Sequence, residues 1–382
     1  MKKITLLLTL LAQLGFAQIP TGYYDHATGT GYTLKNQLKE IINTDAEGFA
    51  NEYIHQPHVY NDFDAFTAAN DLDNYYENDG TILDIYSENP LSTDPYNYTP
   101  VIDECGEYNG EGQCYNKEHT IPQSIFSQNE PMRGDAFHLY PTDGRVNGFR
   151  SNYPFGYVGS NLVSQNGITN PTMNGSKLGN NINTGLFLYS GTVFEPIDEF
   201  KGDIARSYFY FVTRYQDEIP GWNSYAMFNG TTTQGITDGF LYTLIDWHIK
   251  DPVSQREIDR NNNTYTYQNN RNPFIDHPEY VQAIWSSHYA AIEALAAQNF
   301  SINSVSIYPN PSNGTFTILF KNLSNDFSVE VFDISGRVVF EDYYTQSSNL
   351  EQTISIDKPS SGVYFVNVKS GSAITTEKII VQ

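Results

Sequence analysis

The hydrophobic pattern of the chain changes near Ser301, and this change constrains the fold more than any other feature. Before it, apolar residues recur with helical spacing, most clearly over residues 201–215. After it, short apolar runs alternate with polar residues and are separated by turn sequences, which is typical of strands. A chain of 382 residues is also long for one domain. We therefore predict an α+β domain over residues 18–300 and an all-β sandwich over residues 301–382.

Local periodicity predicts the elements of the first domain. We expect helices over residues 33–42, 64–76, 142–151, 201–215, 241–250 and 279–297. We expect strands over residues 82–86 and 113–121. The remaining segments should be a proline- and asparagine-rich loop at 89–100, a winding surface segment at 160–184 and a tight polar turn at 268–278.

The N-terminus has the pattern of a signal peptide. Lys2 and Lys3 precede a short apolar run that ends near Leu14, and Ala17 offers a small residue for cleavage. The run is too short to span a bilayer comfortably. We expect residues 1–17 to be removed, with an uncleaved anchor as the alternative, and we expect no membrane span in the mature protein.

The chain has two cysteines, Cys105 and Cys114, on either side of a turn-rich loop. In an exported protein, two nearby cysteines favour one disulfide, and two thiols are too few for a structural zinc site. We expect the two residues to be bridged.

The formal net charge of −23 counts against a protein that coats nucleic acid, because binding to phosphates needs lysine and arginine. It does not exclude a nuclease, since a metal and a few local arginines can bind one phosphate. The acidic composition slightly favours a phosphodiesterase that acts on a non-nucleic substrate.

Reactive side chains gather in residues 115–156. The carboxylate of Glu118 and the amide oxygen of Asn147 suit Mg²⁺, and His119 can take a proton from water. Along a strand, Glu118 and His119 should point to opposite faces. On a helix, Asn147 and Arg150 should share one face. The inventory therefore predicts a hydrolytic site that combines a metal with a base.

Each of these residues alone is more typical of a surface or structural role, so the joint pattern carries the prediction. We expect His138 to be either structural, bonding Asp135 or the site backbone, or part of the chemistry. We expect structural roles for His248 and His277. For Glu195, a role as a core or loop anchor and a functional role are equally expected.

The stretch Asn116-Lys-Glu-His-Thr-Ile-Pro-Gln-Ser124, with Asp135-Ala-Phe-His138 and Gly144-Arg-Val-Asn147-Gly-Phe-Arg150-Ser-Asn152, resembles the secreted bacterial endonuclease I family. This resemblance implies a ββα-metal (His-Me finger) core with surrounding helices. It also implies that His119 is the general base, that Glu118 and Asn147 hold Mg²⁺ or another divalent cation such as Mn²⁺, and that DNA, with RNA as a second candidate, is cleaved with little sequence preference.

One departure from the family concerns the arginine that holds the scissile phosphate. Some members carry it on a longer insertion after the histidine, whereas residues 124–132 are short here. Arg133 is the nearest candidate, and Arg150 or Arg206 could serve instead. We take Arg133 and Arg150, with His119, as the catalytic candidates.

Tyr308-Pro-Asn-Pro-Ser-Asn-Gly314 and the terminal Lys378-Ile-Ile-Val-Gln382 are similar to the C-terminal sorting domain of type IX secretion cargo. The resemblance implies recognition by that machinery and a location outside the cell or on its surface. An ordinary Ig-like binding module is the alternative. We expect a monomeric secreted endonuclease. A catalytically inactive surface-binding protein is the remaining rival, and the intact Glu118, His119 and Asn147 speak against it.

Overall fold

The structure is a computed structural model that describes residues 19–43, 55–164, 168–301, 305–320, 326–345, 351–357, 359–370 and 373–382. The predicted signal peptide lies outside these residues. The chain divides into two compact units, Met1–His288 and Tyr289–Gln382. The first unit is mixed α+β and the second is a β-sandwich, which confirms the predicted fold class.

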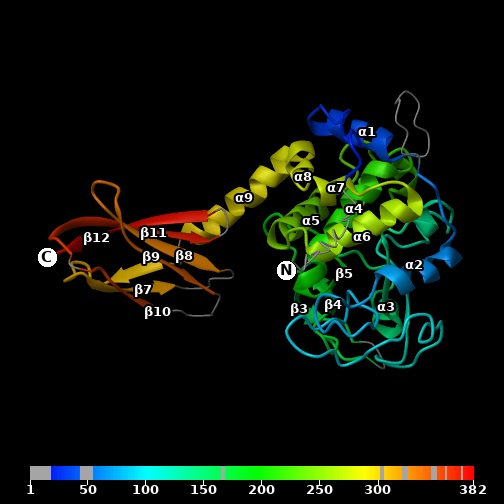
Figure 1. Ribbon diagram of the computed structural model, residues 1–382, viewed down its shortest axis with the longest axis horizontal. Helices are drawn as coiled ribbons and strands as arrows, with labels where there is room; N and C mark the ends of the chain where they lie inside the picture. Colours follow the sequence, from blue (N-terminus) through cyan, green and yellow to red (C-terminus); the bar gives the residue numbers. More distant parts are fainter. Residues whose placement is uncertain are drawn as a thin grey trace, which may run out of the picture. The chain divides into compact units, whose positions relative to one another are not determined.

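Helix α4 (Lys201–Arg214) forms the centre of the first unit, and all of its residues are buried. Helices α1 (Gly31–Ile42), α5 (Asp238–Lys250) and α7 (Pro273–Asp276) pack against it (Figure 1). Its aromatic residues also contact rings from other segments, with Phe209 beside Trp285 and Phe211 beside Trp222. Its charged residues are buried as well, and Arg206, for example, pairs with Glu257.

Two predicted helices differ from the observed ones. Helix α2 (Phe63–Asn70) ends six residues earlier than the predicted end at Tyr76, because the Asp73 carboxylate accepts backbone N–H groups of the turn that follows. The predicted helix 279–297 is two helices, α8 (Tyr280–Ile284) and α9 (Ser286–Ser301), separated at Trp285.

The sequence analysis missed helix α6 (Gln255–Gln268) altogether. Its start carries a capping box, in which the Ser254 hydroxyl accepts from the Glu257 backbone and the Glu257 carboxylate accepts from the Ser254 backbone. The predicted polar turn that follows contains the short helix α7. Short 3₁₀ turns complete the unit: η1 (Tyr60–Asp62), η2 (Met132–Gly134), η3 (Asp198–Phe200) and η4 (Ile219–Trp222).

The predicted ββα unit is present. Strand β1 (Tyr115–His119) pairs antiparallel with β2 (Leu139–Asp143), so that Glu118 lies opposite Tyr140 and His119 opposite Leu139. Helix α3 (Gly144–Arg150) follows directly, and the Asp143 carboxylate caps it by accepting from the Val146 N–H. The three elements place residues from both ends of this segment beside one another.

The predicted strand over residues 82–86 is wrong. Its apolar residues are buried, but only Ile82 forms a single bridge, to Leu72, and the chain then turns. The segment predicted to wind over the surface at 160–184 instead contributes to a sheet of three antiparallel strands, β3 (Val158–Leu162), β4 (Lys177–Asn181) and β5 (Thr192–Glu195).

The second unit has two antiparallel sheets. One has the order β10-β7-β6 and the other β12-β11-β8-β9. Their bounds are β6 (Val305–Tyr308), β7 (Thr315–Phe320), β8 (Phe327–Asp333), β9 (Val338–Tyr344), β10 (Glu351–Ser355), β11 (Gly362–Ser370) and β12 (Ala373–Val381). Alternate residues such as Phe316, Val329 and Val366 form its core, as the alternating pattern predicts. Within the described residues, no helix has the length and apolarity needed to cross a membrane.

Candidate active site

Four of the five predicted site residues, all except Arg133, line one cleft of about 610 Å³ on the first unit. Glu118 and His119 reach it from the end of β1, and Asn147 and Arg150 reach it from α3. The disulfide between Cys105 and Cys114, whose Cα atoms are 5.8 Å apart, confirms the predicted bridge, and Cys105 lies at the cleft wall.

The orientation of His119 is fixed by the backbone. Its Nε2 lies 2.8 Å from the carbonyl oxygen of Arg133, so Nε2 carries the hydrogen and Nδ1 is the unprotonated nitrogen. The ring stacks on Tyr60, with 5.4 Å between centroids. Burial, with a smaller contribution from His138, lowers the pKa of His119 to about 3. The imidazole is therefore neutral at ordinary pH, which is the form that accepts a proton.

Glu118 is buried and held from two sides. Its Oε1 accepts from the Tyr86 hydroxyl at 2.6 Å and pairs with Arg150 at 2.9 Å. Burial raises the pKa of Glu118, while Arg150 and Tyr86 oppose that rise. Adjacent strand residues were expected to face opposite ways, yet Glu118 and His119 both line the cleft. Strand β1 ends at His119, so the alternation of faces does not continue through it.

The amide of Asn147 is oriented by hydrogen bonds on its nitrogen. Nδ2 donates to Asn116 Oδ1 at 2.6 Å and to the Lys117 carbonyl at 3.3 Å. These hydrogen bonds occupy the amide N–H groups of Asn147. They leave its Oδ1 available as a ligand or acceptor on a residue that lines the cleft. A carboxylate and an amide oxygen at one cleft wall form a donor set that fits a hard divalent cation.

The guanidinium of Arg150 is 1% exposed. It donates to the carbonyl oxygens of His119 at 2.9 Å and Thr120 at 2.6 Å, in addition to its ion pair with Glu118. Arg150 therefore ties the end of β1 to α3 and positions Glu118.

Arg133 lies differently. Its guanidinium covers the Tyr60 ring at 4.4 Å from the centroid, and its Nε donates to Gln123 at 3.3 Å. In the part of the chain that the structure describes, no carboxylate forms an ion pair with it. Tyr60 and Gln123 line the cleft. Arg133 therefore lies at the edge of the cleft, and no ion pair with a described residue neutralises its positive charge.

Residues 30–279 match the family described as Endonuclease I, and residues 306–382 match the Secretion system C-terminal sorting domain. The chain belongs to the endonuclease I family. It is 30% identical over 269 residues to the extracellular ribonuclease of Bacillus subtilis, covering 69% of this chain and 78% of that protein. It is also 30% identical over 271 residues to the extracellular ribonuclease of Bacillus amyloliquefaciens, with the same coverage.

A solved immunoglobulin-like β-sandwich from Bacteroides vulgatus is similar over 21% of this chain and 84% of its own, at 16% identity and a TM-score of 0.19.

The endonuclease I match makes this protein a nuclease, a hydrolase of phosphodiester bonds. The sorting domain implies secretion to the cell surface or the medium. Both sequence resemblances are thereby confirmed.

Several residues that the sequence singled out lie elsewhere in the nuclease. Arg206 is fully buried and pairs with Glu257, so it does not reach the cleft as suggested. His138 contacts the Met132 carbonyl at 2.6 Å, next to the backbone that orients His119. Asp135 accepts from the hydroxyls of Tyr210 and Tyr215 and so ties this segment to α4.

Three further predictions concern structural roles. His248 contacts Arg206, and His277 contacts Glu279. Glu195 pairs with Lys201 and accepts from the backbone of Val158, as an anchor would. The contacts of His248 and His277 agree with the expected structural roles, and those of Glu195 agree with the anchoring role, one of the two that the sequence left open.

Sequence reasoning missed two residues that hold the site. Tyr86 donates to Glu118 from a segment more than 30 positions earlier, and Tyr60 covers His119 from a still earlier one. A lone tyrosine has no local signature of such a role. Lys117 could have been noticed, because it lies inside the motif; it pairs with Asp64 and with Glu104, the latter at 3.0 Å.

Proposed function

We propose that this nuclease is a metal-dependent endonuclease that hydrolyses DNA with little sequence preference, using His119 as the general base and one divalent cation. The observation that carries the proposal is the tie between His119 Nε2 and the Arg133 carbonyl. It leaves Nδ1 unprotonated on a residue that lines the same cleft as Glu118 and Asn147.

Glu118 and Asn147 are the residues that would hold the cation, Mg²⁺ or Mn²⁺. When bound, it would neutralise charge on the scissile phosphate and lower the pKa of its coordinated waters, one of which can protonate the leaving oxygen. The chain supplies the orientation of both ligands. Tyr86 and Arg150 fix Glu118, while Asn116 fixes the amide of Asn147.

The remaining steps belong to the protein. His119 Nδ1 accepts the proton of the attacking water, and the Arg133 carbonyl stabilises the imidazolium that results through Nε2–H. The Arg133 guanidinium would contact a non-bridging oxygen of the phosphate, because it has no carboxylate partner among the described residues. Arg150 acts through Glu118 and the backbone. Of the two arginines, Arg133 is therefore the better candidate for the phosphate.

RNA is the second candidate substrate, and the names of the two Bacillus relatives favour it. Contacts to phosphates without readout of bases would allow both polymers. The products expected from the family carry 5′-phosphate and 3′-hydroxyl ends. A phosphodiesterase for non-nucleic substrates remains the rival that the assay must separate.

The test compares three substrates, with and without a chelator: supercoiled plasmid, single-stranded RNA and a small synthetic phosphodiester. Metal-dependent nicking of plasmid is the expected result, and cleavage of the small diester alone would overturn the proposal. His119→Ala should bind metal as the wild type does and lose about 10²–10⁴-fold in the rate of the chemical step. Loss of metal binding in that variant would show that His119 is a ligand.

The pH profile gives a second readout. Only the neutral imidazole accepts a proton, so the rate falls once pH drops through the pKa of His119. Because burial lowers this pKa to about 3, we expect the rate to hold well below pH 6.5, where an ordinary histidine would already be charged. An acid limb near 6.5 that disappears in His119→Ala would contradict this environment.

A further inference from the structure

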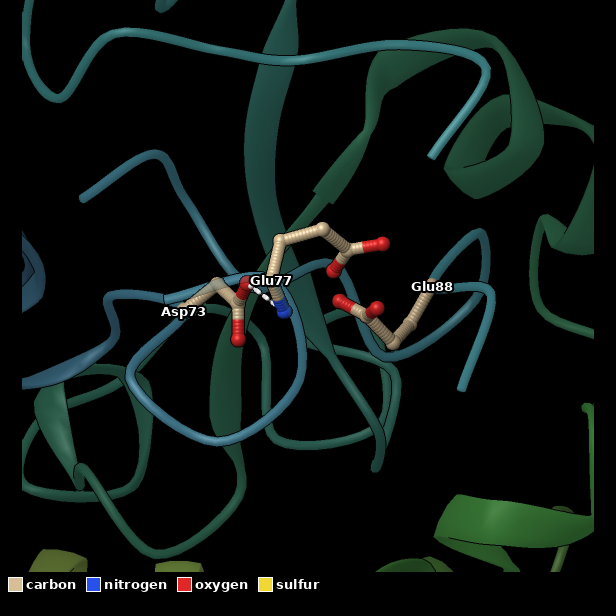
Figure 2. Close-up of side chains that lie close together, drawn as sticks. All are labelled: Asp73, Glu77 and Glu88. Carbon is tan, nitrogen blue, oxygen red and sulfur yellow. Dashed lines mark hydrogen bonds between the residues drawn. The ribbon is translucent and has the colours of Figure 1, made fainter. Parts of the chain in front are cut away.

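Three carboxylates form a compact cluster, and none of them belongs to a residue that lines the proposed catalytic cleft. Asp73, Glu77 and Glu88 each place an oxygen within 4.8 Å of the others. Figure 2 shows the carboxylates of Glu77 and Glu88 turned toward one another, with Asp73 beside them. We propose that this cluster binds a second divalent cation of the calcium class, separate from the catalytic metal.

Unpartnered oxygens point to a missing positive ligand. Glu88 is fully buried, and its Oε1 accepts from the Asn89 N–H, but its Oε2 is buried with no hydrogen-bond partner. Glu77 Oε2 is buried and unpartnered as well. A buried carboxylate oxygen without a donor is costly, and proteins normally satisfy it with a hydrogen bond, a cation or a metal. One cation bound in the cluster would satisfy both oxygens.

The protein supplies no compensating charge of its own. Within the described residues, no lysine, arginine or histidine forms an ion pair with Asp73, Glu77 or Glu88. Asp94 adds a further carboxylate close by. Burial, followed by Asp94 and Asp73, holds the pKa of Glu88 well above its usual range. Full ionisation of these neighbouring carboxylates is therefore unfavourable on its own, and a bound cation would offset the repulsion between them.

The donor set favours calcium over magnesium. All three side chains offer oxygen, and the chain around them is irregular, which suits the six to eight oxygen ligands and flexible geometry of calcium. The Asp73 oxygens already accept four backbone N–H groups, from Tyr75 to Asn78. Asp73 thus fixes the turn that carries Glu77, while Glu77 and Glu88 hold the oxygens with spare capacity.

The segment between Glu77 and Glu88 connects this cluster to the catalytic site. Asp84 accepts from the Asp143 N–H at 2.7 Å, at the start of α3, and Tyr86 donates to Glu118. A cation that holds Glu77 and Glu88 together would hold this segment in place. Calcium should therefore stabilise the fold and, through Tyr86, the orientation of a catalytic ligand.

The binding experiment uses the full-length protein with Glu118→Ala, so that the catalytic site is impaired. Calorimetric titration with calcium should still give one site, with a dissociation constant of about 10⁻³ M or tighter, as in extracellular calcium modules. Adding Glu88→Gln or Glu77→Gln should weaken it by at least about tenfold, the effect of losing one charged ligand. Asp79→Asn is the matched control, because this exposed carboxylate lies on the same segment but bonds Thr81 and Asn97.

Thermal unfolding separates ligation from a merely structural role. Saturating calcium should raise the melting temperature of the Glu118→Ala protein by roughly 5–10 °C, and Glu88→Gln should abolish the rise. In chelator, Glu88→Gln should be at least as stable as its parent, because the amide replaces a buried carboxyl group that is costly to ionise beside other carboxylates. A normal calcium response in a folded Glu88→Gln protein would overturn the proposal, and so would absence of binding in Glu118→Ala. If Glu88→Gln does not fold, the same calcium response is measured on Glu77→Gln, because Glu77 is only half-buried, and that result decides.

Discussion

The hydroxyl of Tyr86 offers a sharp test of how Glu118, the proposed metal ligand, is held. It donates to Glu118 Oε1 at 2.6 Å inside the fold, and Arg150 is the other partner of the same oxygen. Tyr86→Phe keeps the ring and removes only this bond. A hydrogen bond to a charged acceptor is worth about 1.5–3 kcal/mol, which corresponds to roughly 10–100-fold in an equilibrium constant. We expect the metal to bind more weakly by that factor.

The assay is a titration of plasmid cleavage with Mg²⁺, with metal binding measured in parallel by calorimetry. Tyr86→Phe should need more Mg²⁺ to reach half of its maximal rate and should recover most of the wild-type rate at saturation. This pattern is expected because Glu118 itself remains. Tyr157→Phe is a matched control, since its hydroxyl also donates to a carboxylate, that of Asp246, away from the cleft.

A Tyr86→Phe protein with unchanged or tighter metal binding would refute the reasoning. It would mean that Arg150 alone orients Glu118 and that the hydroxyl only lowers the basicity of the carboxylate. A rate that stays low at saturating Mg²⁺, with normal metal affinity, would also refute it, because the hydroxyl would then act on the reaction itself.

Three other outcomes are expected. Arg133→Met should lower kcat/KM by about 10²–10³-fold, the usual effect of removing one donor to the developing charge, with metal affinity unchanged; weaker metal binding would contradict this role. Replacing Cys105 and Cys114 together with serine should lower the free energy of unfolding by roughly 2–3 kcal/mol, from the loop closed by the bridge, as measured by denaturant titration against the oxidised protein. A chain ending at Asn299 should cleave DNA at the full rate, and a folded but inactive product would place part of the nuclease beyond the predicted boundary near residue 300.

That the candidate site residues lie together could be predicted from sequence because the cluster is local. Glu118, His119, Asn147 and Arg150 come from one ββα unit, in which strand pairing and a helix cap fix their relation. Their partners come from distant segments, and no spacing rule links Tyr86 to Glu118. The exact use of each arginine depends on such partners, so the sequence alone left Arg133, Arg150 and Arg206 as alternatives.

The errors in the fold prediction have physical causes. The apolar run at residues 82–86 signals burial, and burial does not require a strand ladder. Helix α6 was missed because its buried face is polar, so apolar periodicity is absent. Arg260, for example, is 5% exposed and donates to the carbonyls of Ala136 and Leu139 and to Asp71. Only the capping box at Ser254 could have revealed the helix.

The charge of the cleft explains how an acidic chain can act on a polyanion, and it yields a final prediction. Three carboxylates, Asp64, Glu104 and Glu118, and two cations, Lys117 and Arg150, line the cleft and leave it one net negative charge. A bound divalent cation reverses that sign. Against one phosphate charge about 6 Å away, this reversal is worth about 1.4 kcal/mol even at the dielectric constant of water, or tenfold in affinity.

Catalytically impaired His119→Ala should therefore bind DNA at least about tenfold more tightly in Mg²⁺ than in chelator at matched ionic strength, as measured by fluorescence anisotropy. The effect should vanish when Glu118→Ala is added, because the cation then loses its charged ligand. Equal DNA affinity with and without Mg²⁺ would show that the cleft attracts phosphate without a metal. In that case the charge of Arg133 at the edge of the cleft, which its ring contact with Tyr60 leaves available, would have to account for binding.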